Sequence, residues 1–108
     1  MLNESDLSLP LGIFELDTDG RVITYNTYGS SLRSKPRSDV IGRNFFGDLL
    51  EHPCTTLEDR FRHVLRQRIA FSRLYFRERA AYDRSVLLMF FSDTQSVMIQ
   101  IDNARRIN

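Results

Sequence analysis

The sequence contains no tryptophan, and it has only one cysteine, one lysine and three prolines among its 108 residues. A single cysteine cannot form an internal disulfide, which favours a reducing compartment. No apolar run approaches the roughly 20 residues that a membrane-spanning helix needs, and the polar segment 1–10 does not resemble a secretory signal. These absences predict a cytoplasmic protein that has no contact with a membrane.

Negative and positive charge are almost equal, with a formal net charge of +1. The chain therefore has no strong overall field that would recruit nucleic acid. Its arginines are concentrated in the second half, where they could bind an acidic partner or form a solvated face balanced by neighbouring acids. The balanced charge favours the solvated face, and we expect no nucleic-acid partner. The arginines in question are Arg60, Arg62, Arg66, Arg68, Arg73, Arg77, Arg79 and Arg84.

The length allows one compact domain with a single core. A composition of 42% hydrophobic and 27% charged residues is ordinary for a globular protein. We expect one domain over residues 1–108, with an N-terminal arm at 1–9 and a polar C-terminal tail at 103–108.

Five segments have the pattern of β-strands. The first two flank a turn at Asp17–Gly20, in which the glycine is free to adopt a positive φ, and they are expected to form a hairpin. The last three alternate apolar with basic residues or form short continuous apolar runs. The five segments are 11–16, 21–25, 71–79, 86–91 and 97–101.

Helical patterns lie between the second and third strands. Asn44 is placed to cap a short helix that ends at Leu50. Thr55 followed by Glu58 matches a capping box and begins the longest helix. Two strands, several helices and three further strands predict an α+β fold with a five-stranded antiparallel sheet. The expected apolar stripe of the long helix is Leu57, Phe61, Val64 and Leu65, and the expected core includes Phe45, Phe46, Leu88 and Phe90.

Two patches of the sequence carry a family resemblance. One is Leu11–Asp17 with Asp19-Gly20 and Tyr25-Asn26, and the other runs from Val40 through Gly42-Arg43-Asn44-Phe45-Phe46 and Asp48 to Pro53-Cys54-Thr55. They resemble the PAS family of sensory domains, and within it the photoactive yellow protein branch, over residues 9–104. The resemblance implies a PAS fold in which short helices pack over one face of the sheet. It also implies that the first two strands lie centrally beside the last.

Cys54 is the first candidate site residue. Backbone N–H groups and the dipole of the following helix would lower the pKa of its thiol and favour a nucleophile. A lone cysteine is also typical of a small buried apolar side chain. The resemblance implies a 4-hydroxycinnamic acid (p-coumaric acid) thioester on Cys54, and hence a blue-light photoreceptor.

Three tyrosines are further candidates for the chromophore site. The resemblance implies that Tyr25 donates a hydrogen bond to the phenolate oxygen of the chromophore, with Tyr28 as a second hydroxyl and Tyr75 in the pocket wall. For Tyr25 ordinary packing with a satisfied hydroxyl is an equal alternative, and for Tyr75 and the adjacent Phe76 core packing is the favoured one. The buried glutamic acid of the family falls on Gly29 or Tyr28, and the sequence has no Asp or Glu between Gly20 and Asp39.

Two alternatives remain open beside the photoreceptor. One is a ligand-free PAS domain for protein interaction or dimerisation. The other is a haem sensor that binds iron through His63 on the long helix. We expect no enzyme and no metal site, because His52 and Cys54 are too few ligands for zinc and no catalytic triad accompanies them. The expected partner is a downstream signalling protein or a second copy of the chain.

Overall fold

The computed structural model describes residues 9–27, 31–77 and 82–105. Tyr28, most of the expected arm and the end of the expected tail lie outside the described residues. The described elements are β1 (Gly12–Leu16), β2 (Val22–Thr27), η2 (Ser31–Ser34), η3 (Arg37–Asp39), η4 (Phe45–Leu49), α1 (Thr55–Gln67), β3 (Ser72–Phe76), β4 (Tyr82–Phe91) and β5 (Ser96–Arg105).

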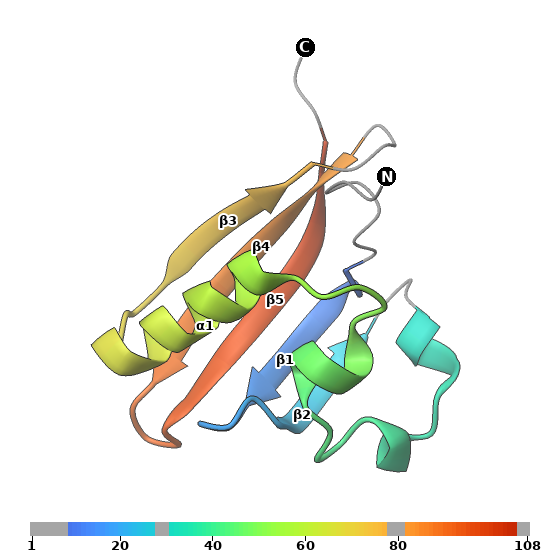
Figure 1. Ribbon diagram of the computed structural model, residues 1–108, viewed down its shortest axis with the longest axis horizontal. Helices are drawn as coiled ribbons and strands as arrows, with labels where there is room; N and C mark the ends of the chain where they lie inside the picture. The colour runs from blue at the N-terminus through green and yellow to red at the C-terminus, as the bar shows by residue number, and fades with distance from the viewer. Residues whose placement is uncertain (1–8, 28–30, 78–81, 106–108) are drawn as a thin grey trace.

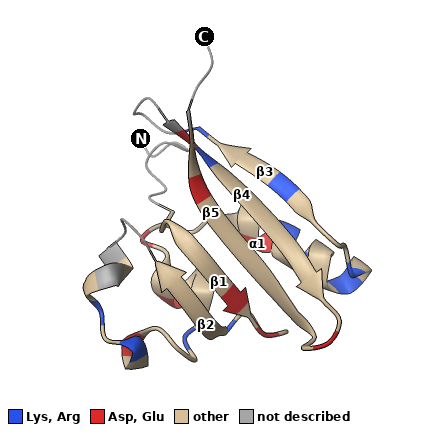
Figure 2. Cartoon of the chain, turned by 180° about the vertical axis from the view of Figure 1, so that it is seen from behind, with Lys and Arg blue, Asp and Glu red and all other residues tan. Residues whose placement is uncertain are grey.

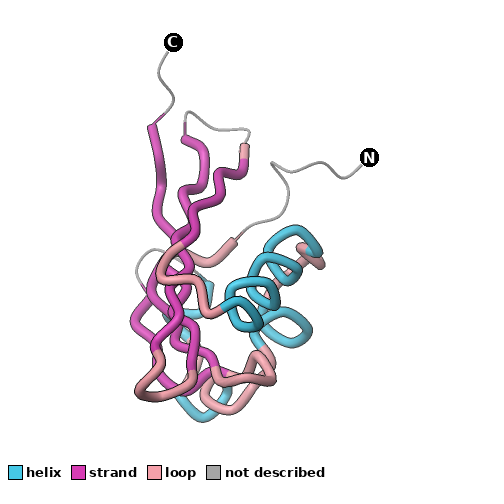
Figure 3. The backbone as a smooth tube through the Cα atoms, turned by 90° about the vertical axis from the view of Figure 1, so that its left-hand side faces the viewer, coloured by secondary structure: helices cyan, strands magenta, loops and turns pink. Residues whose placement is uncertain are grey.

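The strands form one antiparallel sheet in the order β2-β1-β5-β4-β3, and the predicted α+β PAS fold is confirmed. The ribbon view shows α1 and η4 lying across one face of this sheet, and the edge-on view shows them on one side of the strands (Figures 1 and 3). The expectation that the first two strands both lie centrally is wrong. Because β1 pairs with β2 on one side and with β5 on the other, β2 becomes an edge strand.

The last two strands are longer than their apolar runs. β4 and β5 pair continuously from Tyr82↔Arg105 to Phe91↔Ser96. Backbone hydrogen bonds carry this ladder beyond the apolar positions, so residues 103–105 belong to β5 and not to the expected tail. β3 is shorter than expected because its pairing with β4 ends at Phe76.

The core lies between the sheet and the two helices. Phe14, Phe45 and Phe61 are completely buried, and Phe46 retains 7% exposure. Phe90 and Leu65 are only partly buried and pack against the edge of the core, so the expectation of a largely buried Phe90 is wrong. Its ring lies near the end of α1, with the Arg68 guanidinium 6.0 Å from the ring centroid.

The start of α1 differs from the prediction. Cys54 is the N-cap residue and makes no side-chain cap hydrogen bond, so the predicted capping box from Thr55 to Glu58 is wrong. The Glu58 N–H instead donates to the Cys54 carbonyl at 3.1 Å. The Glu58 carboxylate is turned along the helix to Arg62, with 3.0 Å between Nη2 and Oε2.

The β1–β2 turn is fastened to the start of η4, and we call this connection the hairpin joint (residues 17–22 with 42–48). Asn44 is its centre. Its Oδ1 accepts hydrogen bonds from the N–H groups of Phe46 (3.0 Å) and Gly47 (2.9 Å), which confirms the predicted cap. Its Nδ2 donates to the carbonyl of Asp19 at 3.0 Å, across the joint.

Backbone hydrogen bonds complete the hairpin joint. The Val22 N–H donates to the Arg43 carbonyl (3.0 Å), and the Gly42 N–H donates to the Val22 carbonyl (2.8 Å). The Phe45 N–H donates to the Gly20 carbonyl at 2.9 Å. These hydrogen bonds satisfy backbone N–H and C=O groups that would otherwise be unpaired beside the core. The joint therefore holds Phe45 and Phe46 against β1.

Candidate functional site

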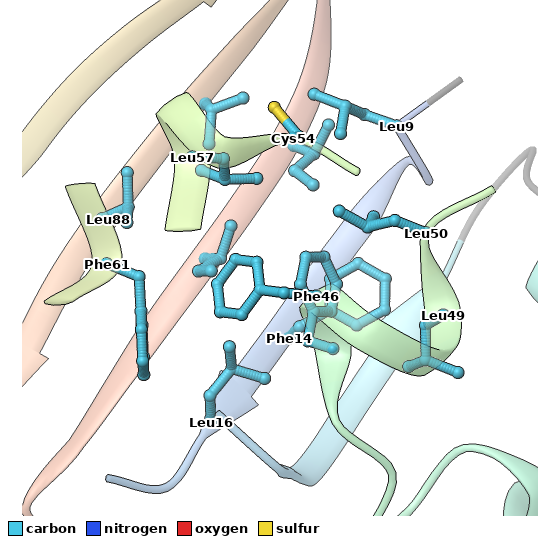
Figure 4. Close-up of a cluster of buried hydrophobic side chains, with 14 of the residues drawn as sticks. Leu9, Phe14, Leu16, Phe46, Leu49, Leu50, Cys54, Leu57, Phe61 and Leu88 are labelled. Atoms are coloured by element: carbon cyan, nitrogen blue, oxygen red, sulfur yellow. The ribbon is translucent and has the colours of Figure 1, made fainter. Parts of the chain in front are cut away.

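Cys54 lies at the margin of the core, at the N-terminus of a 13-residue helix. Its exposed fraction is 6%, whereas Leu57 in the next turn is completely buried. The close-up view shows the cysteine between Leu9 and Leu57, with Leu50 beside it (Figure 4). A helix N-terminus carries a partial positive charge, which is directed toward the Cys54 position. The surrounding side chains are apolar.

Several core residues on this side of the sheet keep some exposure. Leu9 is 2% exposed, and Leu50 is 9% exposed. By contrast, the core residues on β4 and β5 have no measurable exposure. Cys54 therefore lies among core residues that are not fully covered, and a group attached to its sulfur would lie against apolar side chains.

Tyr25 lies on β2 and packs against the same core. Its ring is parallel to that of Phe14, at 6.2 Å between centroids, and the Arg37 guanidinium lies 4.9 Å from its centroid. No hydrogen bond of the Tyr25 hydroxyl is found among the described residues. The Tyr25 side chain is half-buried.

A continuous line of aromatic contacts leads from Tyr25 into the core. Phe14 contacts Phe45 at 4.9 Å between ring centroids, Phe45 contacts Phe46 at 5.2 Å, and Phe46 contacts Phe61 at 5.1 Å. Phe46 lies in the middle of the cluster in Figure 4. These rings make the inner wall of any ligand site between β2 and α1.

The carboxylate nearest to Tyr25 along the sheet faces the other way. Glu15 pairs with Thr24, while Tyr25 pairs with Phe14 on the core side. Because side chains alternate between the two faces of a strand, Glu15 points away from the core. Its Oε2 accepts a hydrogen bond from Ser96 Oγ at 2.7 Å. The core side of β2 thus has a phenol donor and no acid among the described residues.

Two other predicted site residues lie elsewhere. Tyr75 is 65% exposed on β3, so its prediction as part of a pocket wall is wrong, whereas the neighbouring Phe76 is buried. The alternation of β3 turns Phe76 inward and Tyr75 outward. His63 is exposed on α1. It therefore does not face the core, and the haem alternative loses the ligand on which it depended.

Two surface hollows formed by described residues lie away from Cys54. One, of about 330 Å³, is lined by Lys35, Asp39, Arg43, Asp48 and Leu49. The other, of about 160 Å³, lies on the outer side of the sheet between β1, β2 and β5, beside Met98. The described residues contain no group of three or more His, Cys, Asp or Glu side chains arranged to hold a metal ion.

Sequence reasoning missed two features of the structure. It treated Asn44 only as a cap, although Asn44 also binds the turn at Asp19. It did not single out Phe71, which is 63% exposed. The alternation of large apolar and basic residues from Phe71 to Arg77 was the available signal for an unusual edge strand.

The fold agrees with the comparison to known proteins. A model of the PAS fold family matches residues 7–96, so the chain belongs to the PAS family. Within this family, the chain is similar to photoactive yellow proteins, the branch that the sequence patches resemble.

The similar proteins include photoactive yellow proteins of two organisms. The chain is 40% identical over 51 residues to that of Rhodothalassium salexigens, covering 47% of this chain and 39% of the relative. It is 34% identical over 59 residues to that of Halochromatium salexigens, covering 54% of this chain and 46% of the relative. The aligned part is therefore less than half the length of each relative.

A solved structure matches over nearly the whole chain. It is the photoactive yellow protein domain of the sensor histidine kinase Ppr from Rhodospirillum centenum, with a TM-score of 0.68 and 21% identity. The match covers 94% of this chain and 93% of that domain, which supports the shared fold. None of the helices formed by described residues has the length and apolar character needed to cross a membrane.

Proposed function

We propose that this chain is a light-sensing module that holds a 4-hydroxycinnamoyl group as a thioester on Cys54. The observation that carries the proposal is the placement of Cys54 at the helix N-terminus, among core residues that are not fully covered. Attachment would form the sulfur–acyl bond, release the activating group of the acid and transfer the thiol proton to solvent. Resemblance to photoactive yellow proteins supports this choice of acyl group.

The proposal assigns one described residue to each end of such a group. Cys54 would hold the acyl end, and the Tyr25 hydroxyl would donate to the phenolic oxygen. Leu9 and Leu50 close the margin beside Cys54 (Figure 4). Because both are nearly buried, they must separate for a ring to enter. We infer that loading rearranges this margin.

The residues do not fit proton transfer from a carboxylic acid at the phenolic end. Glu15 faces the outer side of the sheet, and Arg37 lies over the Tyr25 ring. We therefore derive no proton-transfer step from a carboxyl group. A phenol buried with few donors has a raised pKa, so the bound group would be less readily ionised here than beside a full set of donors.

Reconstitution with an activated 4-hydroxycinnamic acid tests the proposal. The loaded protein is expected to gain an absorption band that bleaches in light and strengthens as the pH rises. Tyr25→Phe should shift this band, whereas Tyr75→Phe, which changes an exposed tyrosine, should leave it unchanged. A folded protein that gains no band at any pH would contradict the proposal.

A ligand-free interaction domain is the second candidate function. Its support is the close packing of Phe14, Phe45 and Phe46 beside Tyr25, which needs no ligand to complete the core. This candidate predicts that no acyl group becomes attached to the protein, while the protein still associates with a signalling partner or with itself. Under both candidates, we propose that the module acts in the cytoplasm.

A further inference from the structure

β3 forms an edge of the sheet, and its outward side chains alternate between aromatic and basic. Phe71 and Tyr75 are 63% and 65% exposed, and Arg73 and Arg77 are also exposed. Residues two apart on a strand share a face, so these four side chains project on the side away from the core. We call this row, Phe71, Arg73, Tyr75 and Arg77, the basic edge.

The backbone of the basic edge is open to a further strand. Among the residues that the structure describes, β3 has β4 on one side and no strand on the other. The Arg73 carbonyl accepts a long hydrogen bond of 3.5 Å from Arg60 Nη1 on α1, which shows that the Arg73 backbone faces away from β4. Because backbone groups alternate along a strand, those of Tyr75 face outward as well.

Charge identifies the kind of segment that would fit this edge. Residues 60–77 contain six arginines and no acidic residue. Arg62 is paired with Glu58, but Arg66, Arg68, Arg73 and Arg77 are exposed. Figure 2 shows Lys and Arg blue on β3 and at the far end of α1, while red lies on other parts of the chain. The edge is complementary to an acidic segment.

Two simpler explanations account for less of this arrangement. Arginines alone protect an edge strand from aggregation, but this role gives no reason to expose two large aromatic side chains between them. Pairing of two copies edge to edge would bring together two edges of the same charge, and in the register centred on Tyr75 it would place Arg73 opposite Arg77. Like charges placed opposite one another are unfavourable.

We propose that the basic edge docks an extended acidic segment of a partner protein, which adds as a strand beside β3. Backbone hydrogen bonds to Arg73 and Tyr75 would fix the segment. Acidic side chains would pair with Arg73 and Arg77, and intervening apolar ones would lie against Phe71 and Tyr75. This docking is independent of any group on Cys54.

Nucleic acid fits the basic edge less well than a peptide. Its recognition relies on a continuous basic groove and does not use outward strand N–H and C=O groups. The peptide is therefore the favoured occupant.

The test uses the full chain and a fluorescent seven-residue peptide in which glutamate and valine alternate at every second position, with serine between them, so that both kinds of side chain share one face of the added strand. Binding measured by anisotropy should be at least about tenfold tighter than for the matching lysine–valine peptide, and it should weaken with salt. Backbone amide shifts of the isotope-labelled protein should concentrate on residues 71–77. Shifts elsewhere, or no binding at millimolar peptide, would overturn the proposal.

Two pairs of variants separate charge from backbone pairing. Arg73→Glu should weaken binding about tenfold, while Arg43→Glu, the same change at an exposed site outside the edge, should leave it unchanged. Tyr75→Pro removes an outward N–H and should abolish binding, whereas Tyr75→Ala should cost only about threefold. Equal effects within either pair, or tighter binding of a thymidine oligonucleotide than of the acidic peptide, would overturn the proposal.

Discussion

The hairpin joint and the basic edge use polar and aromatic residues in opposite ways. In the joint, Asn44 satisfies three hydrogen-bond partners on two segments, and the adjacent Phe45 is completely buried. On the basic edge, Tyr75 is exposed and Arg73 reaches only across the sheet surface to Ser85 Oγ, at 3.0 Å. The joint therefore holds the fold together, and the edge remains available to a partner.

This difference explains what a family resemblance can reveal. The residues that carry it, around Asp19-Gly20 and Gly42–Phe46, meet in the hairpin joint, where they position the core beside Tyr25. None of these residues lies on β3, so they do not predict which of its side chains are exposed. The residues of the hairpin joint therefore predict the fold and the region around Tyr25. A surface that binds a partner must instead be found from side-chain exposure and charge.

The largest loss of unfolding free energy is expected when the Phe46 ring is removed. Phe46→Ala removes a nearly buried ring that contacts Phe45 and Phe61, and it should lower the free energy of unfolding by about 3–5 kcal/mol. Tyr75→Ala, at an exposed position, should change it by less than about 0.5 kcal/mol. Urea unfolding of both variants checks the comparison, and similar losses would contradict it.

Substitution of Gly12 is expected to cause the next largest loss of unfolding free energy. Its φ is +146°, and a Cβ there would lie 2.4 Å from the Asn26 carbonyl oxygen. Gly12→Ala should therefore cost about 2–3 kcal/mol through strain between β1 and β2. Gly47→Ala is the control, because its Cβ would meet nothing closer than 3.6 Å. Thermal unfolding that ranks Gly47→Ala as the more harmful change would refute this reading of the hairpin.

Asn44→Ala should cost about 1–2 kcal/mol, since it removes the cap of η4 and the bond to Asp19. Asn26→Ala, at an exposed position on β2, is the matched control and should be close to neutral. Chemical unfolding measures both. If Asn44→Ala were as mild as its control, Asn44 would not be the centre of the joint.

The smallest loss of unfolding free energy is expected for a substitution on the surface of α1. Glu58→Ala removes the ion pair with Arg62, in which both side chains are substantially exposed. Such a pair contributes less than about 0.5 kcal/mol, and salt should remove most of that. A loss above 1 kcal/mol that persists in high salt would show that Glu58 has a structural role at the helix start.

Particular residues show how far the sequence predicts this structure. Apolar spacing predicted the strands and the buried face of α1, and the Asn44 cap was predicted from its position. The helix start was wrong because Thr55 and Glu58 also fit the first turn of a helix capped by Cys54. The end of β5 was missed because backbone pairing with β4, and not apolar alternation, extends it to Arg105.

The site was less predictable than the fold. Cys54 and Tyr25 were named from motifs, and the structure places Cys54 in the core with Tyr25 packed against it. Tyr75 was misplaced because a one-residue change along a strand reverses the face, so the adjacent Phe76 takes the inward position. The exposure of β3 depends on strand order, which periodicity alone does not determine.

The most direct test of the central claim is the intact mass of the protein after incubation with an activated 4-hydroxycinnamic acid, with Cys54→Ser treated in parallel. If Cys54 is the attachment site, the native chain gains one hydroxycinnamoyl group and Cys54→Ser gains none. A folded native chain that gains no acyl group, or a Cys54→Ser chain that gains one as readily, would contradict the assignment of Cys54 as the attachment site.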